Sequence, residues 1–393
     1  MSDIKEEALK LHEENKGKLE IKLKVKCDDR KDLTLAYTPG VAEPCLKIKE
    51  NKLDSFKYTN RANTIAVISD GTAVLGLGDI GPEAGMPVME GKALLFKRFA
   101  GIDAYPLCIG SKDVEDIVRF CKMIEPSLAG INLEDISAPR CVEIERRLQK
   151  EMHIPVFHDD QHGTAMVVLA GLINALKVVG KKKEDVKVVI SGTGAAGSSI
   201  IRHLYRYGFK NIIASDKDGI LRQSEKDQYD FLKKELLDYV NLNDTPYKNL
   251  AEALKGADIF IGVSAPNLVL VDMVKTMNKD AIIFSMANPN PEITYDDAIK
   301  GGARIVGTGR SDKPNQINNL LAFPGLFRGL LDAGAIQMDE DIKLIVSEAI
   351  ASLVSDEERN ENYIIPSAFD EILVPTIAKA VKEFCISKGN TRY

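Results

Sequence analysis

The sequence of 393 residues contains few of the features that define disulfide-rich or nucleic-acid-binding proteins. Its six cysteines form no C-x-x-C pair and no regular framework, which favours free thiols in a reducing compartment such as the cytoplasm. Basic residues are not in excess, because 52 lysines and arginines face 58 aspartates and glutamates, for a net charge of -6. A chain with this charge balance predicts no nucleic-acid partner.

Long apolar runs and targeting signals are also missing. The most apolar stretch, residues 165–180, is interrupted by Asn174 and Lys177 and falls short of the roughly 20 apolar residues that cross a bilayer. We therefore expect a core helix there and no membrane partner. The N-terminal segment MSDIKEEALKLHEENKGK mixes acids with lysines and has no apolar centre, so we expect no export or transit signal.

From about residue 64 onward, short apolar runs bounded by glycine, proline and aspartate alternate with segments of helical periodicity. This alternation is typical of an α/β fold with mostly parallel strands. Because the pattern occurs twice, we expect two α/β domains. We assign residues 1–162 to the first domain, residues 163–330 to the second, and residues 331–393 to helices that pack back on the other layers.

Two elements are expected ahead of the first sheet. Residues 3–15 have helical spacing behind Ser2, and residues 18–25 (KLEIKLKV) alternate between apolar and charged side chains. A period of two residues is typical of a strand, so we expect a helix followed by a strand.

A glycine-rich loop lies in VKVVISGTGAAGSS, between an apolar run and a helical pattern. Gly192, Gly194 and Gly197 have the G-x-G-x-x-G spacing, which allows a tight turn and a close approach of the backbone to a pyrophosphate. Ala195 and Ala196 complete the loop, and the amides that open the following helix would bind the phosphates. The motif alone is weak, but a strand before it and a helix after it indicate a Rossmann-like dinucleotide site.

The choice between NAD and NADP is left open by the next apolar run. NIIASD delivers Asp216 19 residues after Gly197, where an acid would bind an adenosine ribose. Asp216 would repel a 2′-phosphate and so slightly favours NAD, whereas the adjacent Lys217 could bind that phosphate.

Four carboxylates follow two other apolar runs. Glu134 and Asp135 come after LAGINL, and Asp159 and Asp160 come after IPVFH. The carboxyl ends of strands in one α/β layer are where such folds bind their ligands, and hard oxygen donors suit Mg²⁺ or Mn²⁺. Acids in solvated loops would give the same spacing, so the spacing alone leaves a metal site and a solvated surface equally open.

Seven motifs in order along nearly the whole chain resemble the malic enzymes, particularly their short form. The resemblance implies an N-terminal malic-type domain for substrate and metal, a C-terminal NAD(P)-binding domain and a homodimer. It also implies oxidation and decarboxylation of L-malate to pyruvate and CO₂ with NAD or NADP and a divalent cation, Mg²⁺ or Mn²⁺. The motifs are LAYTPGVAEPC, TIAVISDGTAVLGLGDIGPEAGMPVMEGKALLFK, INLEDI, VFHDDQHGTA, MANPNPEI, QINNLLAFPGLFRG and NYIIP.

The resemblance also implies a role for individual residues. It makes Tyr37 the general acid and Lys92 the general base, with Asp159 as a neighbouring acid that orients or tunes the base. On the residues alone, Tyr37 would more often be a core tyrosine and Lys92 a surface lysine. The remaining implied residues are the metal ligands Glu134, Asp135 and Asp160, and the asparagines Asn288 and Asn319, which would contact substrate and the nicotinamide end of the cofactor.

This set of residues suits the implied chemistry. A cation that binds the 2-hydroxyl and the C1 carboxylate of malate lowers the pKa of the hydroxyl, so that a neutral Lys92 can take its proton as hydride leaves C2. The pKa of Lys92 must then be lowered from about 10.4, and Asp159 acts in the opposite direction. The sequence departs from the long animal enzymes at Thr72 and Ala73, where those enzymes have an arginine for a malate carboxylate. The group that neutralises the C4 carboxylate is therefore left open.

Three other functions fit parts of the pattern. Malolactic enzyme would use the same scaffold but retain the hydride and release lactate. A dinucleotide-sensing module without catalysis would bind cofactor but show no turnover, although four crowded carboxylates argue against an idle site. An amino-acid dehydrogenase of similar plan would need no metal.

Overall fold

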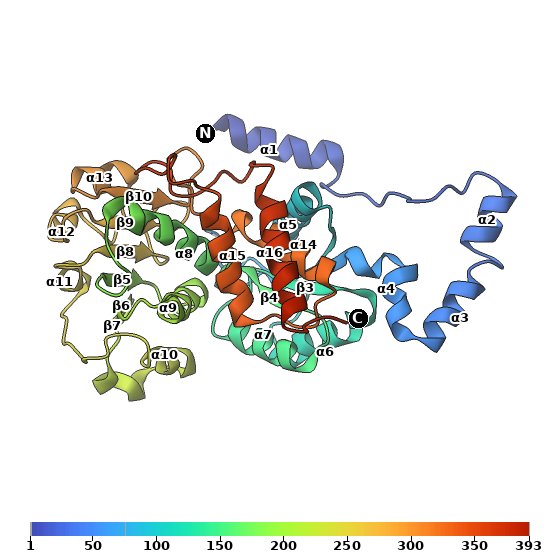
Figure 1. The fold of residues 1–393 in the computed structure, drawn as a ribbon, viewed down its shortest axis with the longest axis horizontal. Helices are drawn as coiled ribbons and strands as arrows, with labels where there is room; N and C mark the ends of the chain where they lie inside the picture. Colours follow the sequence, from blue (N-terminus) through green and yellow to red (C-terminus); the bar gives the residue numbers. More distant parts are fainter. Residues whose placement is uncertain (1, 75, 393) are drawn as a thin grey trace.

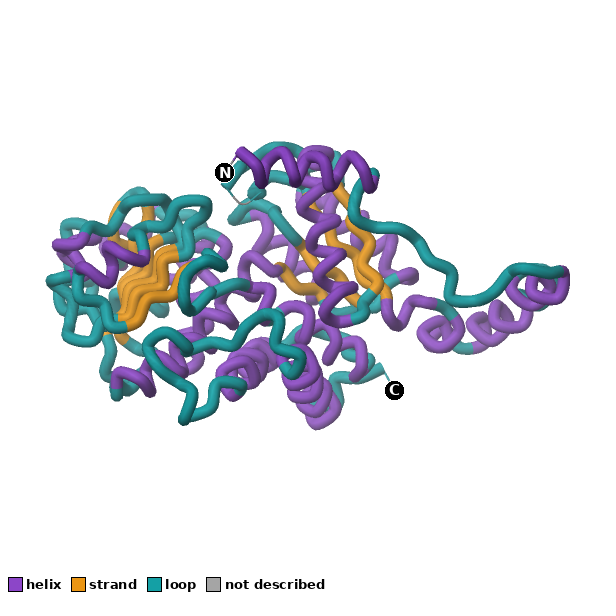
Figure 2. The backbone as a smooth tube through the Cα atoms, turned by 90° about the horizontal axis from the view of Figure 1, so that it is seen from above, coloured by secondary structure: helices purple, strands orange, loops and turns teal. Residues whose placement is uncertain are grey.

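The computed structural model describes residues 2–74 and 76–392, which form two sheets surrounded by helices (Figure 1, Figure 2). The first sheet has four parallel strands in the order β2-β1-β3-β4. Strands β1, β3 and β4 are buried along their whole length, as expected for a parallel sheet covered on both faces. The strands are β1 (Thr64–Ser69), β2 (Asp103–Cys108), β3 (Gly130–Leu133) and β4 (Val156–His158).

Helices cover both faces of this first sheet. Successive residues of a strand point to opposite faces, so Ala66 and Ile68 of β1 pack with α6 and α7, while Ile65 and Val67 belong to the core that contains α5. The covering elements are α5 (Pro82–Ala100), α6 (Val114–Ile124), η3 (Glu125–Ser127) and α7 (Arg140–Glu151).

The second sheet has six strands in the order β10-β9-β8-β5-β6-β7, and only the short β7 is antiparallel among its described strands. The crossover from β5 to its neighbour β6 runs through α9, which gives the βαβ unit of a dinucleotide-binding fold. Its strands are β5 (Lys187–Ser191), β6 (Asn211–Asp216), β7 (Gly219–Ile220), β8 (Ile259–Gly262), β9 (Ile282–Ser285) and β10 (Ile305–Thr308). Its helices are α9 (Ala195–Tyr207), η4 (Gln223–Gln228), α10 (Phe231–Leu236), α11 (Leu250–Leu254), α12 (Val271–Val274) and α13 (Tyr295–Lys300).

Helix α8 (Asp159–Val179) connects the two sheets and is the core helix that the sequence predicts. It is long and apolar enough to cross a membrane, as no other helix of the described residues is, but 72% of its apolar window is buried inside the protein. The side-chain amide of Asn174, which interrupts the apolar run, donates to the carbonyls of Ala351 (2.9 Å) and Ile364 (3.0 Å). The polar interruption is therefore satisfied within the core.

The C-terminal helices pack back on both layers. Helix α14 contacts α5 and α16, and α15 contacts α8. Two glycines let α14 approach α16 closely, since a Cβ on Gly325 would lie 2.7 Å from the Cβ of Ile377 and one on Gly329 would lie 2.6 Å from the carbonyl oxygen of Ala378. The segments are η5 (Asn319–Leu321), α14 (Phe323–Ala333), α15 (Glu340–Ser352) and α16 (Leu373–Ser387).

The N-terminal segment leaves the body of the molecule. Helix α1 is held to α5 by Lys18, whose backbone N–H donates to Glu90 Oε2 (3.1 Å) and whose Nζ donates to the carbonyl of Pro87 (2.7 Å). Residues 19–54, the N-terminal arm, then project away and return at α4 (Figure 1, Figure 2). The elements of this part are α1 (Ser2–Asn15), α2 (Arg30–Ala36), α3 (Ala42–Glu50), η1 (Lys52–Asp54), α4 (Ser55–Tyr58) and η2 (Asn60–Asn63).

The prediction of a strand over residues 18–25 is wrong for this single chain. These residues form no strand, and the apolar side chains of the alternating pattern are exposed, at 86% for Ile21 and 74% for Leu23. A strand needs a partner edge for its backbone hydrogen bonds, and none of the described strands pairs with this segment. The predicted α/β class with two domains is confirmed, whereas the domain boundaries at residues 162 and 330 stay a prediction.

Candidate active site

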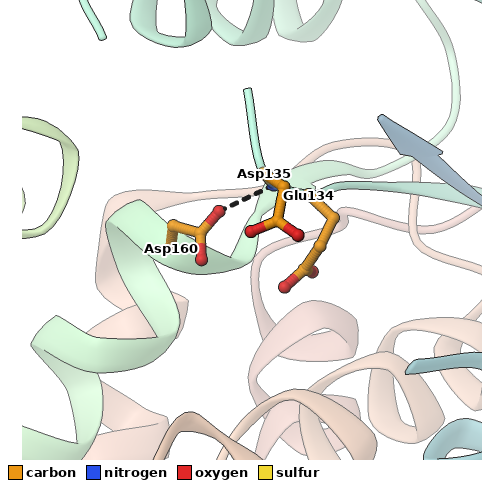
Figure 3. Close-up of side chains that lie close together, drawn as sticks. All are labelled: Glu134, Asp135 and Asp160. Carbon is orange, nitrogen blue, oxygen red and sulfur yellow. Dashed lines mark hydrogen bonds between the residues drawn. The ribbon is translucent and has the colours of Figure 1, made fainter. Parts of the chain in front are cut away.

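The four predicted carboxylates meet at one edge of the first sheet. Glu134 and Asp135 directly follow β3, and Asp159 and Asp160 open α8 directly after β4, the parallel neighbour of β3. The side chains of Glu134, Asp135 and Asp160 point toward one another, and one oxygen atom of each lies within 4.8 Å of the others (Figure 3). The backbone N–H of Asp135 donates to Asp160 Oδ2 at 2.9 Å and so ties the two strand ends together.

The backbone at Asp135 takes an uncommon conformation. Its φ of +53° lies in the left-handed region that residues other than glycine rarely adopt. The local cost of such a conformation is about 1–3 kcal/mol, and it persists where the surrounding structure fixes it, often at functional sites. Here the turn brings the side chain of Asp135 to the same side as that of Glu134.

The electrostatics of the cluster fit a bound cation. Burial, with the charge of Asp160, raises the pKa of Asp135 to about 7, and burial raises the pKa of Glu134 well above its ordinary value. Asp135 Oδ2 is buried and has no hydrogen-bond partner among the described atoms. A divalent ion would stabilise the ionised carboxylates and satisfy this oxygen, and three carboxylate ligands suit Mg²⁺ or Mn²⁺. The set could therefore hold such a metal ion.

Lys92, the predicted base, reaches the cluster from α5. Its Nζ lies 2.5 Å from Asp159 Oδ2, 3.0 Å from Glu134 Oε1 and 4.1 Å from the centre of the Phe323 ring. Burial lowers the pKa of Lys92, but the negative charges of Asp159 and Glu134 outweigh burial and raise the pKa above its ordinary value. In the absence of a cation, Lys92 is therefore held as an ammonium ion.

Asp159 is fully buried and connects Lys92, the predicted base, to Asn319, which follows the second sheet along the chain. Its Oδ2 accepts from Lys92 and also from Asn319 Nδ2 at 2.6 Å. This contact requires Gly163, one turn along α8, because a Cβ there would lie 2.0 Å from Asp159 Oδ1 and 2.9 Å from the Cβ of Asn319. Asn319 thus contacts Asp159 directly, in addition to the substrate role that the sequence predicts for it.

The glycine-rich loop has the geometry of a dinucleotide cradle between β5 and α9. Gly192 has a φ of +107°, and a Cβ on Gly197 would lie 1.8 Å from the carbonyl oxygen of Gly192, so both positions exclude side chains. A Cβ on Gly194 would meet no described atom within 4 Å. Gly194 therefore faces open space, where a pyrophosphate could approach the backbone.

Asp216 lies at the end of β6, at the place that a Rossmann fold gives to the ribose contact. It accepts from Thr193 Oγ1 (2.7 Å), from the backbone N–H of Lys217 (2.7 Å) and from Lys233 Nζ (2.6 Å). Burial raises the pKa of Asp216, but these donors, above all Lys233, lower it below its ordinary value. Lys233 was not predicted from the sequence, and it places a second cation beside the ribose position.

One cavity of about 640 Å³ is lined both by the glycine-rich loop and by a residue of the carboxylate cluster. Its lining includes the loop residues Gly194, Ala195 and Ala196, the cluster residue Asp160, and both predicted asparagines, Asn288 and Asn319. A larger groove of about 810 Å³ lies between α5, α14 and α16 and contains none of the predicted site residues. The smaller cavity is therefore the candidate site.

Tyr37, the predicted acid, does not line this cavity of its own chain. It lies at the C-terminal end of α2 on the N-terminal arm, 66% exposed, and α2 projects away from the sheets (Figure 1). The described residues that line the cavity include no tyrosine.

Two further residues support the cluster and were missed. Asn132 Nδ2 donates to Glu134 Oε2 at 2.8 Å from within β3, and the Phe323 ring lies against the Lys92 ammonium. A fully buried amide inside an apolar strand is a signal that the sequence contained, because such a group needs a polar partner. The contact with Phe323 joins residues 231 positions apart and depends on the tertiary fold.

Fold and site together define an NAD(P)-dependent oxidoreductase with an acid cluster beside its cofactor loop. The sequence profile of the malic enzyme N-terminal domain matches residues 16–149, and that of the malic enzyme NAD-binding domain matches residues 161–385. The chain belongs to the malic enzyme family.

Individual relatives are similar along the whole chain. A bifunctional malic/malolactic enzyme of Bacillus subtilis is 52% identical over 389 residues, which cover 99% of this chain and 95% of that protein. An NAD-dependent malic enzyme of Geobacillus stearothermophilus is 52% identical over 378 residues, covering 96% of this chain and 78% of that protein. The crystal structure of malic enzyme from Pyrococcus horikoshii covers 99% of this chain and 92% of its own, with a TM-score of 0.94 and 46% identity.

Proposed function

We propose that this chain oxidises and decarboxylates L-malate to pyruvate and CO₂ while it reduces NAD⁺ or NADP⁺, with Mg²⁺ or Mn²⁺ as cofactor. The observation that carries the proposal is the shared cavity, in which Asp160 of the carboxylate cluster and the dinucleotide loop line one space. Relatives named as NAD-dependent and as NADP-dependent malic enzymes agree with either cofactor. A homodimer is proposed as the assembly.

Glu134, Asp135 and Asp160 would hold the metal ion. The bound ion would polarise the 2-hydroxyl of malate and stabilise the negative charge that develops on this oxygen during decarboxylation. Two of these carboxylates also set the charge around Lys92, so their neutralisation would lower the pKa of the amine.

Lys92 would act as the base in the first step. Its neutral amine takes the proton of the 2-hydroxyl as the hydride at C2 passes to the nicotinamide. Asp159 and Asn319 hold Lys92 in place, since Asp159 Oδ2 accepts from both side chains. In the second step the bond between C3 and the departing carboxyl group breaks, and an acid must then protonate C3 of the resulting enolate.

Steady-state absorbance at 340 nm tests the proposal. With L-malate, each nicotinamide and Mn²⁺, we expect NAD(P)H and pyruvate to accumulate together, and we expect EDTA to abolish both. Turnover that persists after metal removal, or no reaction with either nicotinamide, would contradict the proposal.

Malolactic activity is a second candidate, because the Bacillus subtilis relative is named a bifunctional malic/malolactic enzyme. The same scaffold would then keep the dinucleotide bound and return the hydride to pyruvate. Product analysis separates the two reactions, since lactate without net NADH indicates malolactic turnover.

A further inference from the structure

A second cavity, of about 390 Å³, lies among helices α7, α8, α9 and α15. It shares no lining residue with the candidate active site and contains none of the carboxylates of the acid cluster. Its lining has more basic than acidic side chains, which favours a negatively charged occupant. The basic residues are Arg146, Arg202, Arg206 and Lys343, and the acidic residues are Glu145 and Glu340.

Three of these cations are hydrogen-bonded to carboxylates, whereas Arg202 is not. The Nη1 atom of Arg202 is buried and has no hydrogen-bond partner among the described atoms. Glu235 Oε2 lies 3.9 Å from this nitrogen, beyond hydrogen-bond distance, and already accepts from Arg146 at 2.6 Å. The three pairs are Arg146 with Glu235, Arg206 with Asp341, and Lys343 with Glu340.

An arginine in this position costs free energy unless an anion reaches it. Burial and the neighbouring charge of Arg146 lower the pKa of Arg202, because both disfavour the charged guanidinium. The guanidinium nonetheless stays protonated, since its ordinary pKa is above about 12. Its N–H groups form a planar fork that matches the oxygens of a phosphate or a carboxylate. A bound oxyanion would therefore satisfy the unpaired Nη1 and offset the repulsion from Arg146.

The other cations of the cavity can join Arg202 around one ligand. Arg206 lies one turn after Arg202 on the same face of α9, Arg146 comes from α7, and Lys343 comes from α15. The ion pairs of Arg146 and Arg206 are exposed, with 45% and 48% of the two side chains accessible, and such pairs contribute little to stability. Both guanidinium groups can therefore turn to a ligand at little cost. The arrangement suits a compact anion.

The cavity also touches the two helices that begin at the candidate active site. Helix α8 begins with two acids of that site, and α9 begins in the glycine-rich loop. Glu145, in the wall of the cavity, accepts from the backbone N–H of His158 (2.9 Å) and lies 2.8 Å from His162 Nε2. The other ring nitrogen of His162 lies 2.9 Å from Ser199 Oγ on α9. A ligand in contact with these residues would fix α8 relative to α9.

We propose that this cavity binds a compact oxyanion, the phosphate or carboxylate group of a small metabolite, through Arg202, and that its occupation strengthens NAD(P)⁺ binding. A ligand that orders α8 and α9 in advance leaves less conformational entropy to be lost when the dinucleotide binds at the start of α9. The coupling is reciprocal, so NAD(P)⁺ also strengthens binding of the anion. The inference goes beyond the proposed reaction and needs no malate turnover.

Calorimetric titration of the full chain with inorganic phosphate and with succinate tests the site. EDTA removes divalent ions and saturating NAD⁺ fills the dinucleotide loop, so that neither place competes for the probe. We expect Arg202→Gln to weaken binding of the probe by roughly 10- to 100-fold, because it removes hydrogen bonds to a charged group. Arg202→Lys keeps the charge but not the fork, so its loss should be intermediate.

The two probes identify the source of the oxyanion. Arg202-dependent binding of phosphate alone indicates a phosphorylated ligand, and such binding of succinate alone indicates a dicarboxylate; either result supports the site. The control is Arg119→Gln, which changes an exposed arginine of α6 outside this cavity and should keep the wild-type affinity. Equal affinities of the wild type and a folded Arg202→Gln for both probes, or no binding of either probe, would overturn the site.

Titration of NAD⁺ and NADP⁺ with and without the bound probe tests the coupling. In the wild type we expect the anion to raise dinucleotide affinity by about fivefold or more, relative to its effect in Arg202→Gln. The variant keeps the glycine-rich loop, so competition of the probe at that loop is the same in both proteins and cancels in the comparison. The same effect of the anion in both proteins would overturn the coupling.

Discussion

The side-chain amide of Asn319 donates a 2.6 Å hydrogen bond to Oδ2 of Asp159, the same oxygen that accepts from Lys92. Asp159 precedes the NAD-binding domain profile and Asn319 lies within it, so the contact links Lys92, the proposed base, to the NAD-binding half of the chain. Lys92 Nζ is held by this oxygen and by Glu134 Oε1, and loss of Asn319 would leave Asp159 Oδ2 with one donor fewer. The orientation of Lys92 therefore depends on a residue far along the chain.

Asn319→Ala tests this dependence. A hydrogen bond to a charged group contributes about 1.5–3 kcal/mol, so we expect kcat for malate oxidation to fall by roughly 10- to 100-fold. Affinity for the dinucleotide, measured by fluorescence titration, should change much less. The matched control is Asn278→Ala, because Asn278 and Lys181 also share one carboxylate, that of Asp258, outside the cavity. Equal losses of activity in the two variants would contradict the assignment.

Gly163→Ala tests the packing behind Asp159. The added Cβ would lie 2.0 Å from Asp159 Oδ1, so the carboxylate or the helix must shift. We expect at least a roughly tenfold loss of kcat, since displacement of a catalytic group by about 1 Å can cost 100-fold.

The control for that variant is Gly91→Ala on α5. Gly91 is also a helical glycine, but a Cβ there would meet only Lys18 Nζ, at 3.9 Å. Alanine is about 1 kcal/mol more favourable than glycine inside a helix, so the melting temperature should rise or stay constant and activity should be retained. Normal turnover in Gly163→Ala would show that the close approach to Asp159 is not needed.

Two glycines of the cofactor loop should respond differently to alanine. A Cβ on Gly197 would lie 1.8 Å from the carbonyl oxygen of Gly192, so Gly197→Ala should lower the melting temperature. A Cβ on Gly194 would meet no described protein atom, so Gly194→Ala should keep the melting temperature but weaken NAD(P)⁺ binding. Calorimetric titration and thermal unfolding of both variants check this. Unchanged NAD(P)⁺ affinity in Gly194→Ala would place the cofactor elsewhere.

The acid cluster could be predicted from the sequence because its geometry follows from topology. Apolar runs that are parallel neighbours end at the same edge of a sheet, and Glu134, Asp135 and Asp160 directly follow two such runs. The cofactor loop was predictable for a similar reason, since its glycines are local to one turn between a strand and a helix.

The contacts that position Lys92, the proposed base, could not be predicted. Asn319 reaches Asp159 from 160 residues away, and nothing local to either residue indicates their partner.

The strand predicted over residues 18–25 failed for a different reason. Its alternation was identified correctly, but the formation of a strand depends on a partner edge, and this chain supplies none among the described residues.

The buried His203 should make stability depend on pH. Burial and the nearby Lys343 lower the pKa of His203 from 6.5 to about 3, and its Nε2 lies 2.9 Å from Ser347 Oγ. Between these pH values the unfolded chain binds a proton that the folded chain excludes. Stability is therefore complete above pH 6.5 and falls on acidification, by at most about 1.4 kcal/mol per pH unit for this group.

Urea unfolding of the wild type and of His203→Gln at pH 7, 6 and 5 measures this contribution. Glutamine can keep a hydrogen bond to Ser347 but does not titrate, so the variant should lose less free energy of unfolding between pH 7 and pH 5 than the wild type. Some dependence will remain, because burial also lowers the pKa of His162. His153→Gln, the same substitution at an exposed histidine, serves as the control for the substitution itself. Equal slopes for the wild type and His203→Gln would mean that His203 gains its proton without unfolding.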